Sequence, residues 1–162
     1  LGCGVGAVGP VGEAGARYSS TAIRKAIEAG DVEAAAAQLS RPWAIEGEVQ
    51  PGFRRGRGLG FATANVSLGD YVRPLLGVYA VRVRLGADWR EGVASVGVNP
   101  TVGALPEPLL EAHLFDFDAE LYGQVIEVAL IAFLREETRF DDIDALKAQM
   151  ARDVEAAKAA LA

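Results

Sequence analysis

A short segment rich in glycine and arginine, residues 52–65, holds the groups of this chain that are best suited to chemistry. Glycine adopts backbone conformations closed to other residues, so main-chain N–H groups can close around an anion, while three arginines add positive charge. Such a segment indicates an enzyme that handles phosphate groups. The residues expected to bind a nucleotide and its phosphates are Gly56, Arg57, Gly58, Gly60, Phe61 and Thr63.

Two residues at the end of this segment, Thr63 and Asn65, could bind a metal ion. They offer oxygen atoms at alternate positions, and oxygen is the ligand that Mg²⁺ takes when it bridges a nucleotide. Threonine and asparagine are also frequent turn residues. The residue types alone leave a Mg²⁺ site and an ordinary turn both open.

Glu111 is the candidate acid–base residue. It lies in an apolar run that we expect to form a strand, two positions before the sole histidine, His113, so both side chains point to the same face. A glutamate in such a run either faces solvent, forms an ion pair or takes part in the chemistry. Its surroundings in the sequence do not choose among these roles.

The composition predicts one main domain with an N-terminal appendage. Of 162 residues, 51% are hydrophobic, enough to bury one substantial core. A net charge of −6 argues against nucleic acid or an anionic membrane as the main partner, because both bind basic surfaces. No apolar run approaches the roughly 20 residues of a membrane-spanning helix. With one cysteine and no signal-peptide pattern, the chain is expected to be cytoplasmic.

Residues 1–40 are expected to form a flexible start followed by two short helices. The first fifteen residues show neither helical nor strand periodicity. The hydroxyl residues at 19–21 can cap a helix that ends at Gly30, and Asp31 can cap a second helix through Leu39. We therefore divide the chain into an N-terminal part, residues 1–40, and a main domain, residues 41–162.

The main domain shows the period of two that is typical of strands. Apolar and polar residues alternate over 81–85, and comparable runs occur at 43–49, 91–98, 109–117 and 125–134. Five or six strands separated by glycine- and proline-containing turns predict a mainly β fold, an antiparallel barrel.

A final helix is expected after this barrel, capped by Asp141 or Asp142. Apolar residues at helical spacing should pack it on the barrel. They are Ile143, Leu146, Met150, Val154 and Leu161.

The segment 52–65 closely resembles the loop of riboflavin kinases, whose usual ending is Gly-Phe-Pro-Thr-Ala-Asn. Further stretches resemble the same family in the same order, from about Arg41 to the C-terminus. They are Gly77–Ala80, Gly97–Thr101, Glu111–Phe117 with Leu121–Gly123, and Leu134–Phe140.

The resemblance implies a six-stranded Greek-key barrel with a C-terminal helix, preceded by short helices. It also implies an enzyme that transfers the γ-phosphoryl group of ATP to the 5′-hydroxyl of riboflavin, giving FMN and ADP. Thr63 and Asn65 would then bind Mg²⁺, and Glu111 would act as general base. Arg135 and Phe140 bracket a segment that the family places near the flavin, and His113 would help to shape the pocket.

Upstream, Tyr18–Arg24 resembles the signature that closes the FMN adenylyltransferase domain of bacterial bifunctional FAD synthetases. We therefore interpret residues 1–40 as a remnant of that domain with linker helices. Such adenylyltransferases need a pair of histidines, whereas this sequence has one. Adenylyltransferase activity is accordingly expected to be absent.

Two alternatives to an active kinase are open. Ala62 stands where the family has proline, which would fix φ before the metal ligands, so the chain could be a non-catalytic flavin- or nucleotide-binding relic. Residues 57–64 also partly match an RNA-recognition octapeptide, the mark of an RNA-binding module. Leu59 and Ala64 replace two of its three stacking aromatics, which makes this alternative the weaker one.

Overall fold

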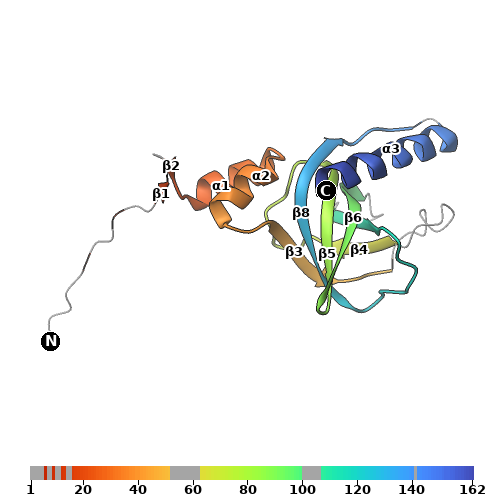
Figure 1. The fold of residues 1–162 in the computed structure, drawn as a ribbon, viewed down its shortest axis with the longest axis horizontal. Coiled ribbons are helices and arrows are strands. Elements are labelled where there is room, and N and C mark those ends of the chain that lie inside the picture. The colour runs from red at the N-terminus through yellow and green to blue at the C-terminus, as the bar shows by residue number, and fades with distance from the viewer. Residues whose placement is uncertain are drawn as a thin grey trace.

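The computed structural model describes residues 6, 9, 12–13, 16–51, 63–99, 107–140 and 142–162. Six antiparallel strands curl into an open barrel, with two helices on its N-terminal side and a long helix across one face (Figure 1). The strands are β3 (Trp43–Glu48), β4 (Thr63–Ser67), β5 (Gly77–Leu85), β6 (Asp88–Asn99), β7 (Glu107–Leu114) and β8 (Val125–Glu136). The helices are α1 (Ser20–Glu28), α2 (Val32–Leu39) and α3 (Ile143–Leu161).

The order of strands across the sheet is β3-β8-β5-β6-β7-β4. Strands β5, β6 and β7 follow one another as neighbours, and β8 returns by a longer connection to pair with β5. This arrangement is a Greek key, in which the fourth strand lies beside the first. The mainly β, six-stranded barrel expected from the sequence is confirmed.

The two edge strands, β3 and β4, meet beside Gly47. The backbone N–H of Gln50 donates to the carbonyl oxygen of Asn65 at 2.9 Å and joins the two edges. At Gly47 an added Cβ would lie only 2.6 Å from Cγ1 of Val66, so glycine lets β3 approach β4. The curled sheet is thereby drawn together at this point.

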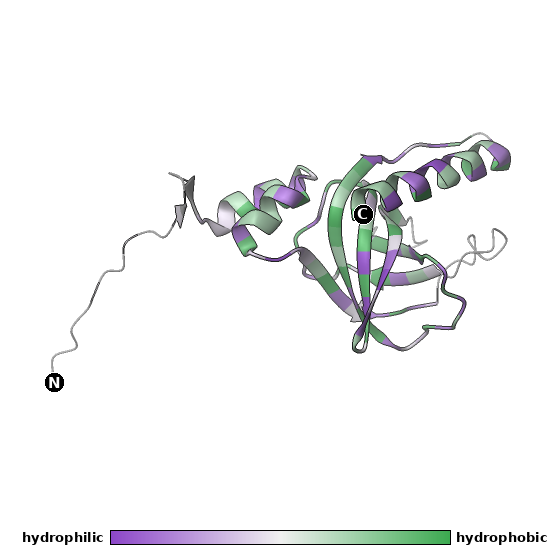
Figure 2. Ribbon diagram, viewed as in Figure 1, coloured by the Kyte–Doolittle hydropathy of each residue, from purple (hydrophilic) through white to green (hydrophobic). Residues whose placement is uncertain are grey.

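The core is formed by the alternate residues that face into the barrel. Ile45, Val66, Tyr79, Leu110 and Leu130 are among its fully buried side chains. Figure 2 shows apolar and polar residues alternating along the strands, as expected for a sheet with one face buried. The outward-facing residues of β4 and β7 are therefore available for other roles.

Helix α3 is capped by Asp142, whose Oδ1 accepts a hydrogen bond from the N–H of Ala145 at 2.7 Å. A second, smaller core joins its C-terminal half to the outside of the sheet, through Ala157 and Leu161. The predicted cap is confirmed, and Val154 packs as expected. Ile143, however, is 61% exposed, so the expectation that it packs on the barrel is wrong.

Helices α1 and α2 are capped by Ser19 and Asp31, as predicted from the sequence. Each cap side chain accepts a hydrogen bond from the backbone N–H three residues on. Val32 of α2 is completely buried within the core of the barrel. The N–H of Leu75 donates to the carbonyl oxygen of Ile27 at 3.2 Å, which ties α1 to the chain before β5. The division at residue 40 stays a prediction, but the two sides of it share one core.

Near the N-terminus, β1 (Gly12–Glu13) pairs with β2 (Ala16–Arg17) in antiparallel fashion. The sequence pattern did not predict this pair. Among the described residues, no helix combines the length and the apolar character needed to cross a membrane.

Candidate functional site

The predicted metal ligands and the predicted base lie side by side on the outer face of the barrel. Thr63 and Asn65 belong to β4, and Glu111 and His113 belong to the neighbouring strand β7. In the antiparallel register Asn65 lies directly opposite Glu111, and Thr63 directly opposite His113. Directly opposite residues have Cβ atoms roughly 4.5–5.5 Å apart, so the four side chains form one cluster.

The expectation that Thr63 and Asn65 lie in a loop is wrong, because both are strand residues. Hydrogen bonds to β7 hold this strand on one side, and the bond from Gln50 holds Asn65 on the other. Successive strand residues alternate between faces, so the spacing of two places both oxygens on the same side of the sheet. A strand therefore gives the pair a more defined geometry than a turn would.

The cluster is half closed to water. Asn65 is only 5% exposed, while Thr63, Glu111 and His113 are half-buried. Thr63 Oγ1 lies 3.3 Å from His113 Nδ1, within hydrogen-bonding distance. On the far side of β7, Ser95 of β6 lies opposite Glu111 and is also half-buried. Ser95 carries no signal in the sequence, because only the strand register places it here.

Burial lowers the pKa of His113 below its ordinary value of about 6.5. Taking a charged imidazolium out of water is unfavourable, so the folded chain favours the neutral ring. Glu111 shares this face, yet desolvation is the dominant cause of the shift.

This shift predicts a pH dependence of stability. Between pH 6.5 and the lowered pKa, the unfolded chain binds a proton that the folded chain does not, so the free energy of unfolding should fall as the pH falls. Above pH 6.5 this group should add no slope. Urea unfolding of the wild type and of His113→Gln at pH 5 to 8 measures the difference. Parallel curves for the two proteins would contradict it, and no second histidine complicates the comparison.

Several other predicted site residues lie outside the described residues. They are Gly56, Arg57, Gly58, Gly60 and Phe61, together with Ala62. Their assignment to nucleotide binding stays a prediction.

Arg135 and Phe140, the residues assigned to the flavin, lie at and beyond the end of β8. The guanidinium of Arg135 makes an ion pair with Asp153 of α3, at 2.7 Å, and its Cζ lies 5.9 Å from the centre of the Phe140 ring. The hydrogen bond to Asp153 raises the pKa of Arg135, and its charge is thereby fixed. Contact of either residue with flavin stays a prediction. Asp153 was not predicted from the sequence, although a charge within the apolar stripe of this helix is a signal for it.

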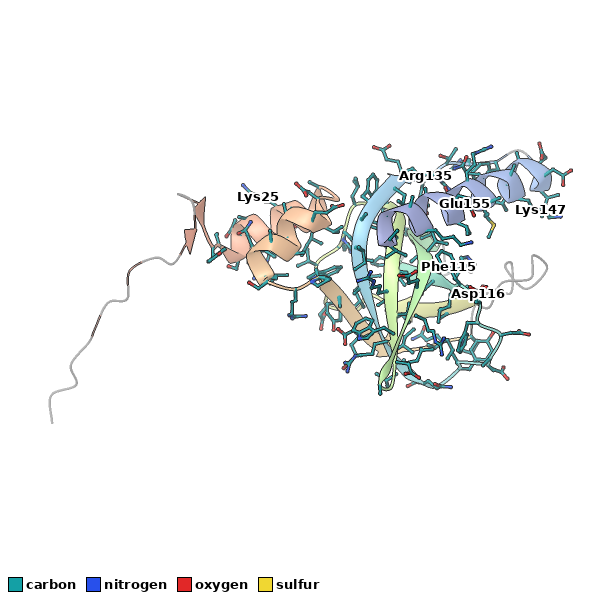
Figure 3. All side chains as sticks on the ribbon, in the orientation of Figure 1. Lys25, Phe115, Asp116, Arg135, Lys147 and Glu155 are labelled. Carbon is teal, nitrogen blue, oxygen red and sulfur yellow. The ribbon has the colours of Figure 1, made fainter. Side chains whose placement is uncertain are left out.

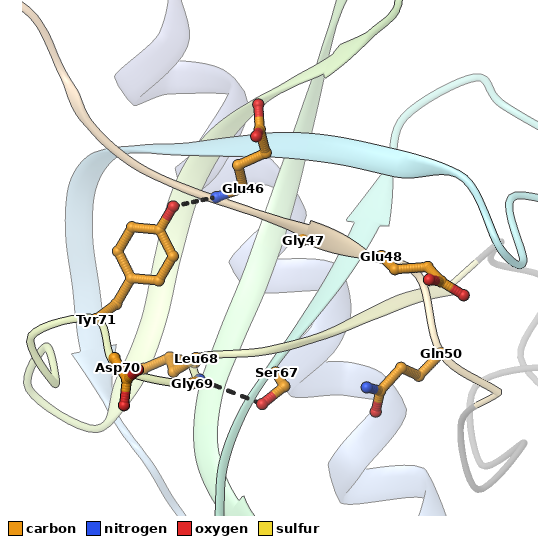
Figure 4. A pocket seen from close by; sticks show the side chains of 9 residues that line it. All are labelled: Glu46, Gly47, Glu48, Gln50, Ser67, Leu68, Gly69, Asp70 and Tyr71. Atoms are coloured by element: carbon orange, nitrogen blue, oxygen red, sulfur yellow. Dashed lines mark hydrogen bonds between the residues drawn. The ribbon is translucent and has the colours of Figure 1, made fainter.

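A separate pocket of about 480 Å³ lies between β3 and the chain that follows β4 (Figure 4). Three carboxylates, Glu46, Glu48 and Asp70, are among its lining residues. The hydroxyl of Tyr71 accepts a hydrogen bond from the N–H of Glu46 at 3.2 Å on one side of it. Of the predicted site residues that the structure describes, none lines this pocket.

A comparison with known families covers the part of the chain that carries this cluster. A family model described as riboflavin kinase matches residues 39–161. The chain belongs to the riboflavin kinase family. The resemblance drawn from the motifs in the sequence is thus confirmed, and the outer-face cluster lies within the matched range.

Individual proteins agree with the family match. The chain is 46% identical over 144 residues to a Haemophilus influenzae protein named bifunctional riboflavin kinase/FMN adenylyltransferase, which covers 88% of this chain and 46% of that protein. The Escherichia coli protein of the same name is also 46% identical, over 142 residues. The chain thus spans about half the length of the curated relatives it matches.

Two solved structures share the fold. One, from Streptococcus pneumoniae and described as a macrolide-efflux protein, gives a TM-score of 0.84 at 37% identity and covers 93% of this chain and 50% of that one. The other, riboflavin kinase from Trypanosoma brucei, gives a TM-score of 0.53 at 21% identity, with 74% and 80% covered. At 21% identity the second structure supports the fold alone.

Proposed function

We propose that this chain transfers the γ-phosphoryl group of ATP to the 5′-hydroxyl of riboflavin, giving FMN and ADP. The observation that carries the proposal is the pairing of Asn65 with Glu111 across β4 and β7. This pairing brings a neutral oxygen ligand and a carboxylate together on one outward face. Membership of the riboflavin kinase family supports the same reaction.

The donor set fits Mg²⁺. Thr63 and Asn65 offer the neutral oxygen atoms that a small, hard cation takes alongside phosphate oxygens and water. Within the part of the chain that the structure describes, no group of three or more histidine, cysteine, aspartate or glutamate residues could hold a metal instead. Held by Thr63 and Asn65, Mg²⁺ would neutralise the negative charge that develops during phosphoryl transfer.

Glu111 would act as the general base. Its carboxylate shares one face with Asn65, so a hydroxyl group held there could pass its proton to Glu111 while lying close to the transferred phosphoryl group. Phosphoryl transfer depends mainly on positioning and charge neutralisation. The chain would therefore use β4 for the metal and β7 for the acceptor.

The neutral state of His113 suits this site. Its lowered pKa leaves an uncharged imidazole beside Thr63 near neutral pH. The ring would shape the pocket without competing with Mg²⁺ for the phosphates. We place the reaction in the cytoplasm, where MgATP is abundant.

Incubation of the purified chain with riboflavin, ATP and Mg²⁺, followed by HPLC, tests the proposal. FMN and ADP should form in equal amounts and only when Mg²⁺ is present. Binding of riboflavin without turnover would instead favour the non-catalytic relic.

With FMN and ATP the chain should make no FAD, because its one histidine leaves no histidine pair for adenylyl transfer. FAD above the level of a no-enzyme control would contradict that part.

A further inference from the structure

One side chain, Arg135, fixes the chain between β8 and α3. Its Nε and Nη2 donate to the two carboxylate oxygens of Asp153 at 2.8 and 2.7 Å, a two-point contact that lysine could not make. Its Nη1 donates to the carbonyl oxygen of Glu136 at 2.9 Å and to Thr138 Oγ1 at 3.5 Å. Asp153 fixes the position of the guanidinium, and the guanidinium in turn fixes the backbone at Glu136 and the side chain of Thr138.

Asp153 is itself tightly held. Its side chain is 9% exposed, and Gln149 Nε2 donates to the same Oδ1 at 2.8 Å. Figure 3 places Arg135 at the end of β8, beside α3. A buried ion pair adds little stability over apolar packing, so its benefit here is a defined geometry rather than a stronger fold.

The segment held in this way rests on β6 at Gly97. The carboxylate of Glu137 occupies the space that a side chain at position 97 would fill, with its Cδ 3.2 Å from the place of a Cβ. Gly97 thus allows Glu137 to lie directly on the outer face of the sheet.

The strand register relates this contact to the site. Gly97 lies opposite Leu109 of β7, and Glu111 is two residues further along β7. Diagonal neighbours of this kind are roughly 7–8 Å apart. Two residues further in the same direction along β7 come His113 and its partner Thr63. Glu111 therefore lies between Thr63 on one side and Glu137 on the other.

We propose that Asp153, acting through Arg135, is a positioning residue that holds Glu137 beside Glu111, on the side away from Thr63, and so sets the affinity for riboflavin. The inference rests on the proposed function. A carboxylate accepts hydrogen bonds and donates none. Riboflavin offers ribityl hydroxyls and a ring N–H as donors, whereas the triphosphate offers negative charge and would be repelled. Glu137 therefore suits the acceptor and not the nucleotide.

Riboflavin affinity, measured by quenching of flavin fluorescence without nucleotide, tests this role. Asp153→Asn keeps the size of the side chain but removes its charge. It should raise the Kd and the KM for riboflavin about tenfold, the usual effect of losing one hydrogen bond to a charged group. The kcat and the KM for MgATP should not change, because Glu111, Thr63 and Asn65 are untouched.

A second variant leaves the ion pair in place. Gly97→Ala adds a methyl group where the Glu137 carboxylate lies and should weaken riboflavin binding in the same way. If thermal melting shows that Asp153→Asn does not fold, riboflavin affinity is measured with Gly97→Ala alone. The matched control is Glu127→Gln, which alters the Arg84–Glu127 pair near the other end of β5 and β8 and should leave riboflavin affinity unchanged.

Wild-type riboflavin affinity in folded Asp153→Asn and in Gly97→Ala would overturn the inference, as would an equal change in the KM for MgATP. If the proposed function itself is wrong, the wild type will form no FMN, and this result distinguishes the two failures.

Discussion

Replacing Glu111 by glutamine should lower the rate of FMN formation at least ~100-fold while leaving the binding of riboflavin and MgATP nearly intact. Glutamine keeps the shape of the side chain opposite Asn65 but cannot accept the proton of the riboflavin hydroxyl. A positioned general base contributes about 10²–10⁴-fold to a rate. Single-turnover measurement of FMN, with binding measured separately, distinguishes a loss of chemistry from a loss of affinity.

The control for this experiment is Glu91→Gln. Glu91 is an exposed carboxylate on β6, and its side chain pairs with Arg82 of β5 at 3.8 Å. It should retain wild-type turnover. If Glu111→Gln also turns over at the wild-type rate, Glu111 is not the base, and the pairing with Asn65 loses its proposed meaning.

Replacing Val32 by aspartate should unfold or nearly unfold the barrel, although Val32 precedes the matched kinase range. The side chain is completely buried in the barrel core, and an unpaired buried charge costs about 3–5 kcal/mol. Domains of this size have about 5–15 kcal/mol of stability in total. Urea unfolding of the whole chain, with flavin binding as a second probe, measures the loss.

Ala37→Asp is the matched control, because Ala37 lies on the same helix but is exposed. It should unfold at nearly the wild-type urea concentration. Equal unfolding midpoints for the two variants would mean that α2 is an appendage, as the division at residue 40 suggests. A lower midpoint for Val32→Asp alone would mean that α2 is part of the kinase fold.

The features that could be predicted from the sequence are those set by local chemistry. The caps at Ser19, Asp31 and Asp142 each depend on a side chain and the backbone N–H three residues away. The strands follow from alternation, which survives in any sheet with one buried face. The prediction that Ile143 packs on the barrel was wrong because helical spacing shows which face of a helix is apolar, but not how far the sheet beneath that face extends.

What could not be predicted depends on contacts between distant segments. The preceding glycines made Thr63 and Asn65 look like loop residues, whereas their partners on β7 come some fifty residues later. The role of Arg135 was open for the same reason, since Asp153 lies on a separate element. Family resemblance supplied the identities of the site residues, and the register supplied their arrangement.

The way in which the barrel closes affects the site directly. Strand β4, which carries both predicted metal ligands, is the last in the sheet, whereas β7 lies between two neighbours. Within the described residues, the backbone bond from Gln50 to Asn65 is the bridge between the two edges. Local fraying of this seam would displace Thr63 and Asn65 together and leave Glu111 in place. Local opening of the barrel at this contact would therefore change the distance between the metal ligands and the proposed base.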